Sequence, residues 1–147
     1  MTEPRIVDLV RDHPGWDSAL TTLQVLRPRL TREVLDDVLA AGTPQGLRYT
    51  GLFVGDDCVA IGGWRVMACT ARIRRFFVED LATAAPVQSR GYGRQLFDAL
   101  LEEARALDCR TVELDSGVTM HGAHRFYLRE RMNIAAHHFE LWLGPRP

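Results

Sequence analysis

The stretch that decides the fold is Thr83-Ala-Ala-Pro-Val-Gln-Ser-Arg-Gly-Tyr-Gly-Arg-Gln-Leu96, where the pattern of the chain changes from strand to helix. Gly91 and Gly93 permit a tight turn, and an amphipathic helix is predicted directly after it. Backbone N–H groups that converge at such a helix start, unshielded by Cβ atoms, form a cradle for anions. Arg90 and Arg94 add positive charge that can fork onto phosphate oxygens. The turn therefore predicts a site that holds a pyrophosphate without transferring it.

One alternative for this turn stays open, and two other classes of phosphate site are excluded. From spacing alone, a glycine-rich connection flanked by solvated arginines stays open as the alternative. The turn is not a dinucleotide-binding fingerprint, because it lacks GxGxxG and follows a predicted strand meander instead of opening a βαβ unit. All 18 basic residues are arginine and lysine is absent. Mechanisms that depend on a P-loop lysine or a pyridoxal-binding lysine are therefore excluded.

Composition predicts one ordinary globular domain spanning residues 1–147. The chain has 147 residues, of which 46% are hydrophobic and 25% are charged, which excludes disordered, collagenous and disulfide-scaffold classes. With 18 basic and 19 acidic residues the formal net charge is −1. No overall field therefore attracts nucleic acid or an anionic membrane, and neither is expected as a partner.

Cysteine usage and the first residues predict a cytoplasmic protein. Cys58, Cys69 and Cys109 are isolated in the sequence, which indicates buried reduced thiols and no metal site. The amino end, from Met1 to Trp16, is charged and lacks the apolar region of a signal peptide. No uninterrupted apolar run approaches the ~20 residues that span a membrane.

Hydrophobic periodicity predicts an α/β (α+β) fold with a mixed, mostly antiparallel sheet and helices on both faces. Thr31 and Gly42 are predicted to begin and end the second helix, and Gly55-Asp56-Asp57 indicates a hairpin. The expected order is a strand at 5–10, helices at 17–26 and 31–41, strands at 49–54, 58–67 and 71–83, a helix at 94–107, a strand at 111–114, a helix at 118–129, and one or two closing strands within 133–143.

Gln88-Ser-Arg-Gly-Tyr-Gly93 resembles the (Q/R)xxGx(G/A) acetyl-CoA motif of the GNAT superfamily of N-acetyltransferases. The preceding strand, the following helix and Ala123-His-Arg-Phe-Tyr127 agree with that resemblance, which runs from about Arg72 to Leu143. It implies a single-domain GNAT-like fold in which acetyl-CoA, a co-substrate, lies between two parallel strands that splay apart. Here those strands would be 76–83 and 111–114.

The resemblance also implies which residues bind the co-substrate. The main chain of Leu81, Ala82 and Thr83 would pair with the pantetheine amides, and the Leu81 N–H would polarise the thioester carbonyl. The pyrophosphate would lie on the backbone N–H groups of Gln88, Ser89, Arg90, Gly91, Tyr92, Gly93 and Arg94. The chain departs from the family at Met120, where asparagine is frequent, and at Arg131-Met132, where Gly-Phe is usual. A cofactor-side hydrogen bond would then come from Ser116, Thr119 or His121.

Acetyl transfer poses two proton problems, because the amine must arrive neutral and the departing thiolate needs a proton. Tyr127 occupies the position of the family's usual acid, and a core tyrosine packed beside Phe126 is the alternative. For the base, Glu79 precedes the Leu81 segment, as in related polyamine acetyltransferases, where the glutamate acts through water. Strand alternation predicts Glu79 on the face shared with Leu81 and Asp80 on the opposite face.

Alternatives to the base stay open at this stage. Glu79 could instead be a surface carboxylate paired with Arg74 or Arg75, and Asp80 or His121 could be the base. His121 and His124 stand three residues apart, so one helix face could supply two metal ligands, but the sequence shows no third ligand. Tyr49 and Trp64 could line an acceptor pocket, but aromatic residues of half-buried strands belong more often to the core.

The resemblance thus implies an acyltransferase that transfers groups other than amino-acyl groups: an acetyl-CoA-dependent N-acetyltransferase whose primary amine attacks the thioester directly. The acceptor would be a small-molecule or peptide amine, and acidic residues suggest a cationic one (Glu79, Asp80, Glu33, Asp36 and Asp37). A non-catalytic acyl-CoA-binding or regulatory domain is the alternative. Family members often form dimers, so a homodimer stays open.

Overall fold

A computed structural model describes residues 2–147, and the chain divides into two compact units. The first ends at Leu114, and the second runs from Asp115 to Pro147. Among the helices of residues 2–147, none is both long and apolar enough to cross a bilayer.

The first unit is built on a five-stranded sheet in the order β1-β2-β3-β4-β5. Neighbouring strands run antiparallel from β1 to β4, whereas β4 and β5 pair in parallel. Gly55 lies at the β2–β3 turn with φ of 60°, a conformation that glycine adopts without strain, and this confirms the predicted hairpin. The strands are β1 Arg5–Asp8, β2 Arg48–Val54, β3 Asp57–Cys69, β4 Ile73–Thr83 and β5 Thr111–Leu114.

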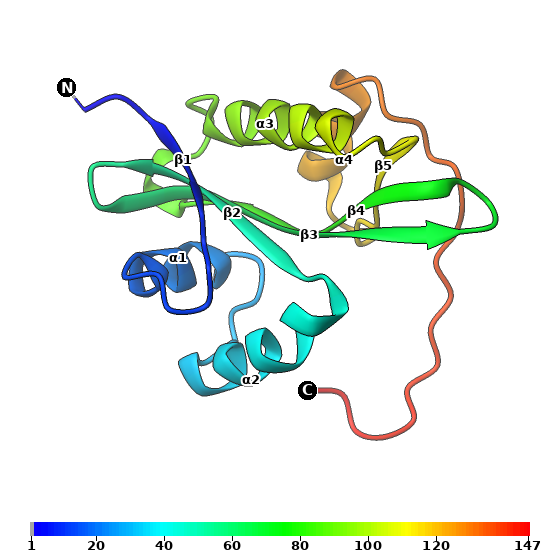
Figure 1. Cartoon of the computed structure of the whole chain (residues 1–147), viewed down its shortest axis with the longest axis horizontal. Helices are drawn as coiled ribbons and strands as arrows, with labels where there is room; N and C mark the ends of the chain where they lie inside the picture. Colours follow the sequence, from blue (N-terminus) through cyan, green and yellow to red (C-terminus); the bar gives the residue numbers. More distant parts are fainter. Residues whose placement is uncertain (1) are drawn as a thin grey trace. The chain divides into compact units, whose positions relative to one another are not determined.

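Helices cover both faces of this sheet, as the sequence predicted (Figure 1). On one face, α1 (Trp16–Leu23) and α2 (Arg32–Gly42) close an apolar core around Trp16 and Phe53. On the other face, α3 (Tyr92–Ala106) places Leu96 and Leu100 in a second core that contains Phe76 and Trp64. The two cores hold the sheet rigid between them, so that the ends of β4 and β5 have a fixed framework.

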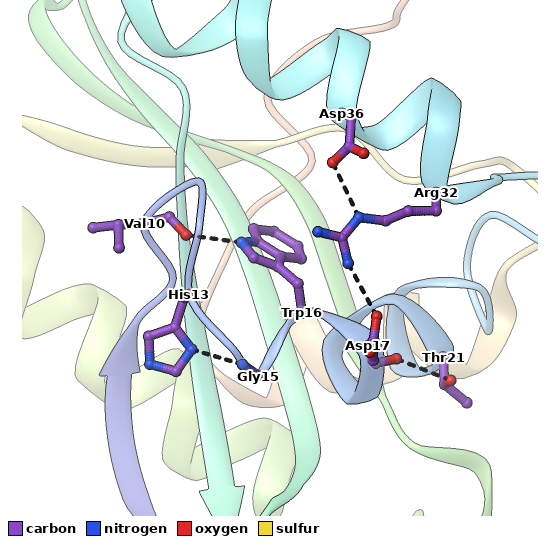
Figure 2. A network of polar contacts seen from close by, with 8 residues as sticks. All are labelled: Val10, His13, Gly15, Trp16, Asp17, Thr21, Arg32 and Asp36. Atoms are coloured by element: carbon purple, nitrogen blue, oxygen red, sulfur yellow. Dashed lines mark hydrogen bonds and ion pairs between the residues drawn. The ribbon is translucent and has the colours of Figure 1, made fainter.

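The start of α2 is fixed by local polar contacts (Figure 2). The Thr31 side chain accepts a hydrogen bond from the Val34 N–H, which confirms the predicted N-cap. Arg32 joins the two helices, because it donates to Asp17 on α1 and to Asp36 on α2, each at 3.0 Å. The helix ends at Gly42 as predicted, but the left-handed cap, with φ of 92°, is at Gly46 after the short 3-10 helix η1 (Thr43–Gln45).

A bulge interrupts the pairing of β4 with β3. Gly63 faces Asp80 and Trp64 faces Val78, so Glu79 is an extra residue with no partner in the register of these two strands. A bulge of this kind bends the strand and breaks the alternation of its side chains. The simple alternation that predicted the face of Glu79 therefore does not hold at this point.

The second unit contains α4 (His121–Arg129), shorter at its start than the predicted helix. The predicted closing strands are wrong, because the described residues 133–143 contain no strand. Ile134, Phe139 and Leu141 are instead highly exposed, at 79%, 90% and 86%. Alternation of apolar residues is present here, but a strand also needs a neighbour with a free edge, and the sequence pattern does not encode that neighbour.

The three cysteines are free thiols, in part as predicted. Cys58 is buried, and burial raises the pKa of its thiol to about 12, so it stays protonated and unreactive. Cys69 and Cys109 are only partly buried, which the sequence prediction of three buried thiols did not anticipate.

Candidate active site

The residues predicted to bind an anion, 88–94, lie in the connection between β4 and α3 and in the first turn of α3. A short 3-10 helix, η2 (Ala85–Val87), follows β4, and the backbone then turns through left-handed conformations at Ser89 and Gly91, with φ of 64° and 85°. The helix begins at Tyr92, and its first turn leaves N–H groups without a partner inside the helix. At Gly93, a Cβ would approach the Thr83 Oγ1 to 3.0 Å, so glycine lets the start of α3 lie against the end of β4.

Substituting Gly91 tests the backbone of this turn. Gly91→Ala is expected to lower the free energy of unfolding by about 1–2 kcal/mol, because alanine is strained at positive φ even though its Cβ meets no atom within 4 Å. Gly91→Asn is expected to cost less, because asparagine enters this region more readily. Urea unfolding followed by circular dichroism measures both. Gly122→Ala in α4, which also has open space but no positive φ, is the matched control, and an equal loss there would contradict the strain argument.

The edge of β4 beyond its parallel partner is the second part of the candidate site. The register of β4 with β5 ends where Val78 faces Leu114, and β4 continues to Thr83. Over that extension, Leu81, Ala82 and Thr83 face Gly62, Ile61 and Ala60 of β3. One edge of the extension is thus paired and the other runs past the ladder with β5, which is the arrangement a peptide-like ligand needs to add as a further strand.

Glu79 forms an ion pair with an arginine, though not the one that the sequence suggested. The Arg65 Nη2 on β3 donates to the Glu79 Oε2 at 3.1 Å, whereas the predicted partners were Arg74 and Arg75. Arg74 instead donates to the Leu107 carbonyl, and Arg75 lies 3.7 Å from Glu113. Glu79 is only half-buried, so water reaches the carboxylate despite the ion pair.

Asp80 lies on the face covered by α1 and α2, opposite Leu81. A Cβ at Gly63 would meet the Tyr49 ring at 2.5 Å and Asp80 Oδ2 at 3.1 Å, whereas a Cβ at Gly62, the partner of Leu81, would meet Leu100 of α3. The prediction for Asp80 is therefore correct. Arg65 lies two residues after Gly63 and therefore on the same face of β3. Because Arg65 pairs with Glu79, the Glu79 carboxylate lies on the face of Asp80, and the prediction that Glu79 shares the face of Leu81 is wrong.

Tyr127 belongs to the second unit. It is half-buried in α4, and its ring meets Phe126 edge-on at 5.5 Å between centroids. Burial raises the pKa of the phenol, so the hydroxyl keeps its proton well above neutral pH. A protonated hydroxyl is the state that a general acid requires.

The histidines form no metal centre in the part of the chain that the structure describes. The His121 and His124 rings stand edge to face at 6.0 Å, and no group of three or more His, Cys, Asp or Glu residues in 2–147 could hold a metal ion. The His124 Nε2 lies 2.8 Å from the Gly117 carbonyl, and His138 lies 3.0 Å from Asp115.

The aromatic residues of the early strands belong to the cores, which confirms the core interpretation. Tyr49 is 4% exposed and Trp64 is 9% exposed. Trp64 stacks on Phe76 at 4.5 Å between ring centroids and donates its indole N–H to Thr50.

Sequence reasoning missed the arginines that bind the acidic pair, Arg27 and Arg65. The pattern of the chain carried no direct signal for them, since Arg27 lies 53 residues from Asp80.

A family model described as the acetyltransferase (GNAT) family matches residues 17–132, a range that contains Glu79, the turn at 88–94 and Tyr127. Among curated proteins, an uncharacterized N-acetyltransferase of Bacillus subtilis (strain 168), YhdJ, is 43% identical over 51 residues. This match covers 35% of the chain and 36% of that protein, so the chain matches about a third of the length of its curated relative.

Solved structures share the fold. A transcriptional regulator from Bacillus halodurans C-125 is similar with a TM-score of 0.81 and 15% identity, over 96% of this chain and 100% of that one. An aminoglycoside N-acetyltransferase in complex with CoA is similar with a TM-score of 0.79 and 12% identity, over 97% and 95% of the two chains. Similarities at these identities extend to the architecture of the sheet and its helices and no further.

Proposed function

The chain belongs to the acetyltransferase (GNAT) family, and from this membership we propose that it is an N-acetyltransferase that uses acetyl-CoA to acetylate a primary amine. One observation carries the proposal. The left-handed turn at Ser89 and Gly91 opens a long helix, and only the short η2 separates that turn from β4, whose edge runs past its parallel partner. If the turn at 88–94 holds phosphate and the extension of β4 before it pairs with amides, the two together would suit a ligand that has both a pyrophosphate and amide groups.

The residues present fit such a co-substrate. The backbone N–H groups from Gln88 to Arg94 would hold the pyrophosphate, with Arg90 exposed beside them to add charge. The main chain from Leu81 to Thr83 would hold the pantetheine amides, and the Leu81 N–H would stabilise the charge that develops on the carbonyl oxygen. The co-substrate supplies an activated thioester when it is bound.

The remaining chemistry is proton transfer by the protein's own side chains. Glu79 would take a proton from the acceptor ammonium through water, which leaves the nitrogen lone pair free to attack the carbonyl carbon. As the carbon–sulfur bond breaks, the Tyr127 hydroxyl would give its proton to the departing sulfur. The raised pKa of Tyr127 supports this role, because the phenol stays protonated at neutral pH.

Ion pairs within the protein weaken the argument for a cationic acceptor. Asp36, Asp80 and Glu79 are paired with Arg32, Arg27 and Arg65, which neutralises three of the five acids that predicted a cationic amine. Recognition would therefore rest on shape and hydrogen bonding as much as on net charge. Both small-molecule and peptide amines belong in the substrate panel.

A thiol-release assay decides between the enzyme and the alternative of a non-catalytic acyl-CoA-binding domain. The purified chain is mixed with acetyl-CoA and a panel of polyamines, aminoglycosides and peptides, and free CoA thiol is measured. Release that depends on an amine is expected. Protection of the fold by CoA against heating, with no release on any amine, would support the non-catalytic domain and contradict the enzyme.

Glu79→Gln tests the base. We expect a loss in kcat/KM of about 100-fold near neutral pH, because the side chain no longer accepts a proton. The deficit is expected to shrink as pH approaches the pKa of the acceptor amine, where the amine is already neutral. Glu113→Gln is the matched control, since both glutamates have arginine partners and side chains that are 29% exposed. A rate for Glu79→Gln equal to wild type across about pH 6–9 would remove Glu79 from the mechanism.

A further inference from the structure

Arg27 reaches from the connection between α1 and α2 to the bulge in β4. Its Nε and Nη2 donate to the Asp80 Oδ1 at 3.0 and 2.9 Å. The Nη2 also donates to the main-chain carbonyl of Glu79 at 3.3 Å. One side chain thus contacts both residues of the acidic pair, one through its carboxylate and the other through its backbone.

The other oxygen of Asp80 is held from β2. The Tyr49 hydroxyl donates to the Asp80 Oδ2 at 2.9 Å, and both residues are buried, at 4% and 8% exposure. Burial raises the pKa of the Tyr49 phenol, and the nearby Asp80 carboxylate raises it further, so the phenol remains a donor. Gly63 makes room for the contact, because a Cβ there would lie 2.5 Å from the Tyr49 ring. Three separate segments of the chain are therefore arranged around one carboxylate.

Stability alone does not explain this arrangement. Removing a carboxylate from water costs free energy that its attraction to an arginine largely offsets, so a buried ion pair is a weak source of stability. Such a pair also fixes the geometry of the groups that it joins. Here it lies at the bulge, where Glu79 has no partner in β3 and the pairing with β5 has already ended at Val78. The β-ladders therefore fix the backbone of Glu79 on neither side.

We propose that Arg27 is a positioning residue for acetyl transfer: by holding Asp80 and the Glu79 carbonyl together, it fixes the peptide planes that lead into Leu81. This inference rests on the proposed function, in which the Leu81 N–H stabilises the developing oxyanion. Rotating those peptide planes changes the direction of that N–H, and a misplacement of about 1 Å in a catalytic group lowers the rate by about 100-fold. Arg27 acts through the backbone and need not touch the reacting atoms.

Arg27→Ala, Arg27→Lys and Arg32→Ala are compared as purified full chains in the thiol-release assay. Arg27→Ala is expected to lower kcat about 10- to 100-fold while KM for acetyl-CoA stays within about twofold of wild type, because the turn at 88–94 is untouched. Arg27→Lys restores the charge but not the two-pronged contact, so partial recovery is expected. Arg32 is the matched control, since it also bridges two segments, at Asp17 and Asp36, away from the bulge. An equal fall in kcat for Arg32→Ala would overturn the proposal.

Amide hydrogen exchange of the peptide 79–83 gives a readout that does not depend on turnover. Exchange is expected to be faster in Arg27→Ala than in wild type and unchanged in Arg32→Ala. Unchanged exchange in Arg27→Ala would overturn the positioning role even if kcat fell. No thiol release by the wild-type chain would overturn the proposed function, and the exchange comparison would still decide whether Arg27 fixes the bulge. Arg27 is half-exposed, so water can replace it and the variants are expected to fold.

Discussion

Tyr127→Phe is expected to lower kcat by a factor of about 10²–10⁴, the range that a positioned general acid contributes. The substitution removes one hydroxyl and keeps the ring beside Phe126, so the packing of α4 is expected to persist. KM for acetyl-CoA should change little, because the proton is needed only as the carbon–sulfur bond breaks. Steady-state kinetics with the best amine of the panel measure both constants.

The pH profile gives this prediction a second test. Burial raises the pKa of Tyr127 above its ordinary value of about 10, and an acid must be protonated to act. Loss of the proton from Tyr127 should therefore not lower kcat of the wild type until pH exceeds about 10. A fall in kcat at lower pH that disappears in Tyr127→Phe would contradict the raised pKa. A kcat for Tyr127→Phe within about twofold of wild type would remove Tyr127 as the acid.

Tyr49→Phe separates loss of chemistry from loss of structure. Its hydroxyl donates to a buried carboxylate, a contact worth about 1.5–3 kcal/mol when one partner is charged. We expect this variant to unfold at a lower urea concentration, whereas Tyr127→Phe should unfold close to wild type. The two tyrosines thus differ in what their hydroxyl groups supply, which the sequence alone does not distinguish.

Local signals predicted most of the framework because they act over a few residues. The glycine of the β2–β3 turn, the threonine cap of α2 and the glycine turn before α3 each impose a backbone conformation on their own neighbours. The strand at Thr111–Leu114 was predicted with its observed bounds, because the short alternating run Thr-Val-Glu-Leu follows directly on a helix. Hydrophobic periodicity then gave the order in which these elements follow one another.

Features that depend on distant partners were not predictable in the same way. The bulge at Glu79 arises from the register of β4 against Gly63 and Trp64, although the sequence of β4 reads as regular alternation. The residues at 133–143 alternate as a strand does but form none, because a strand requires hydrogen-bonded pairing with a neighbouring strand, which alternation alone does not encode. The contact of Arg27 with Asp80 joins segments that the pattern treats separately, one as a helix end and the other as a strand.

Trp16→Ala is expected to lower the free energy of unfolding by about 3–5 kcal/mol, a large part of the 5–15 kcal/mol that stabilises an ordinary domain. Trp16 is 1% exposed, and its ring meets Tyr49 edge-on at 5.3 Å between centroids. The indole N–H also donates to the Val10 carbonyl at 2.9 Å (Figure 2), so truncation leaves both a cavity and an acceptor without its donor.

Trp142→Ala is the matched control for this prediction, and the comparison links the core to the site. Trp142 is 42% exposed in a segment without helix or strand, so its loss should change the free energy of unfolding by no more than about 0.5 kcal/mol. Equal urea midpoints for the two variants would contradict the burial argument.

Because Trp16 supports the ring of Tyr49, and Tyr49 holds Asp80, any folded Trp16→Ala protein should also show faster amide exchange at 79–83. The apolar core under α1 would then be a physical support of the bulge that precedes Leu81, and loss of a side chain that touches no substrate would lower kcat.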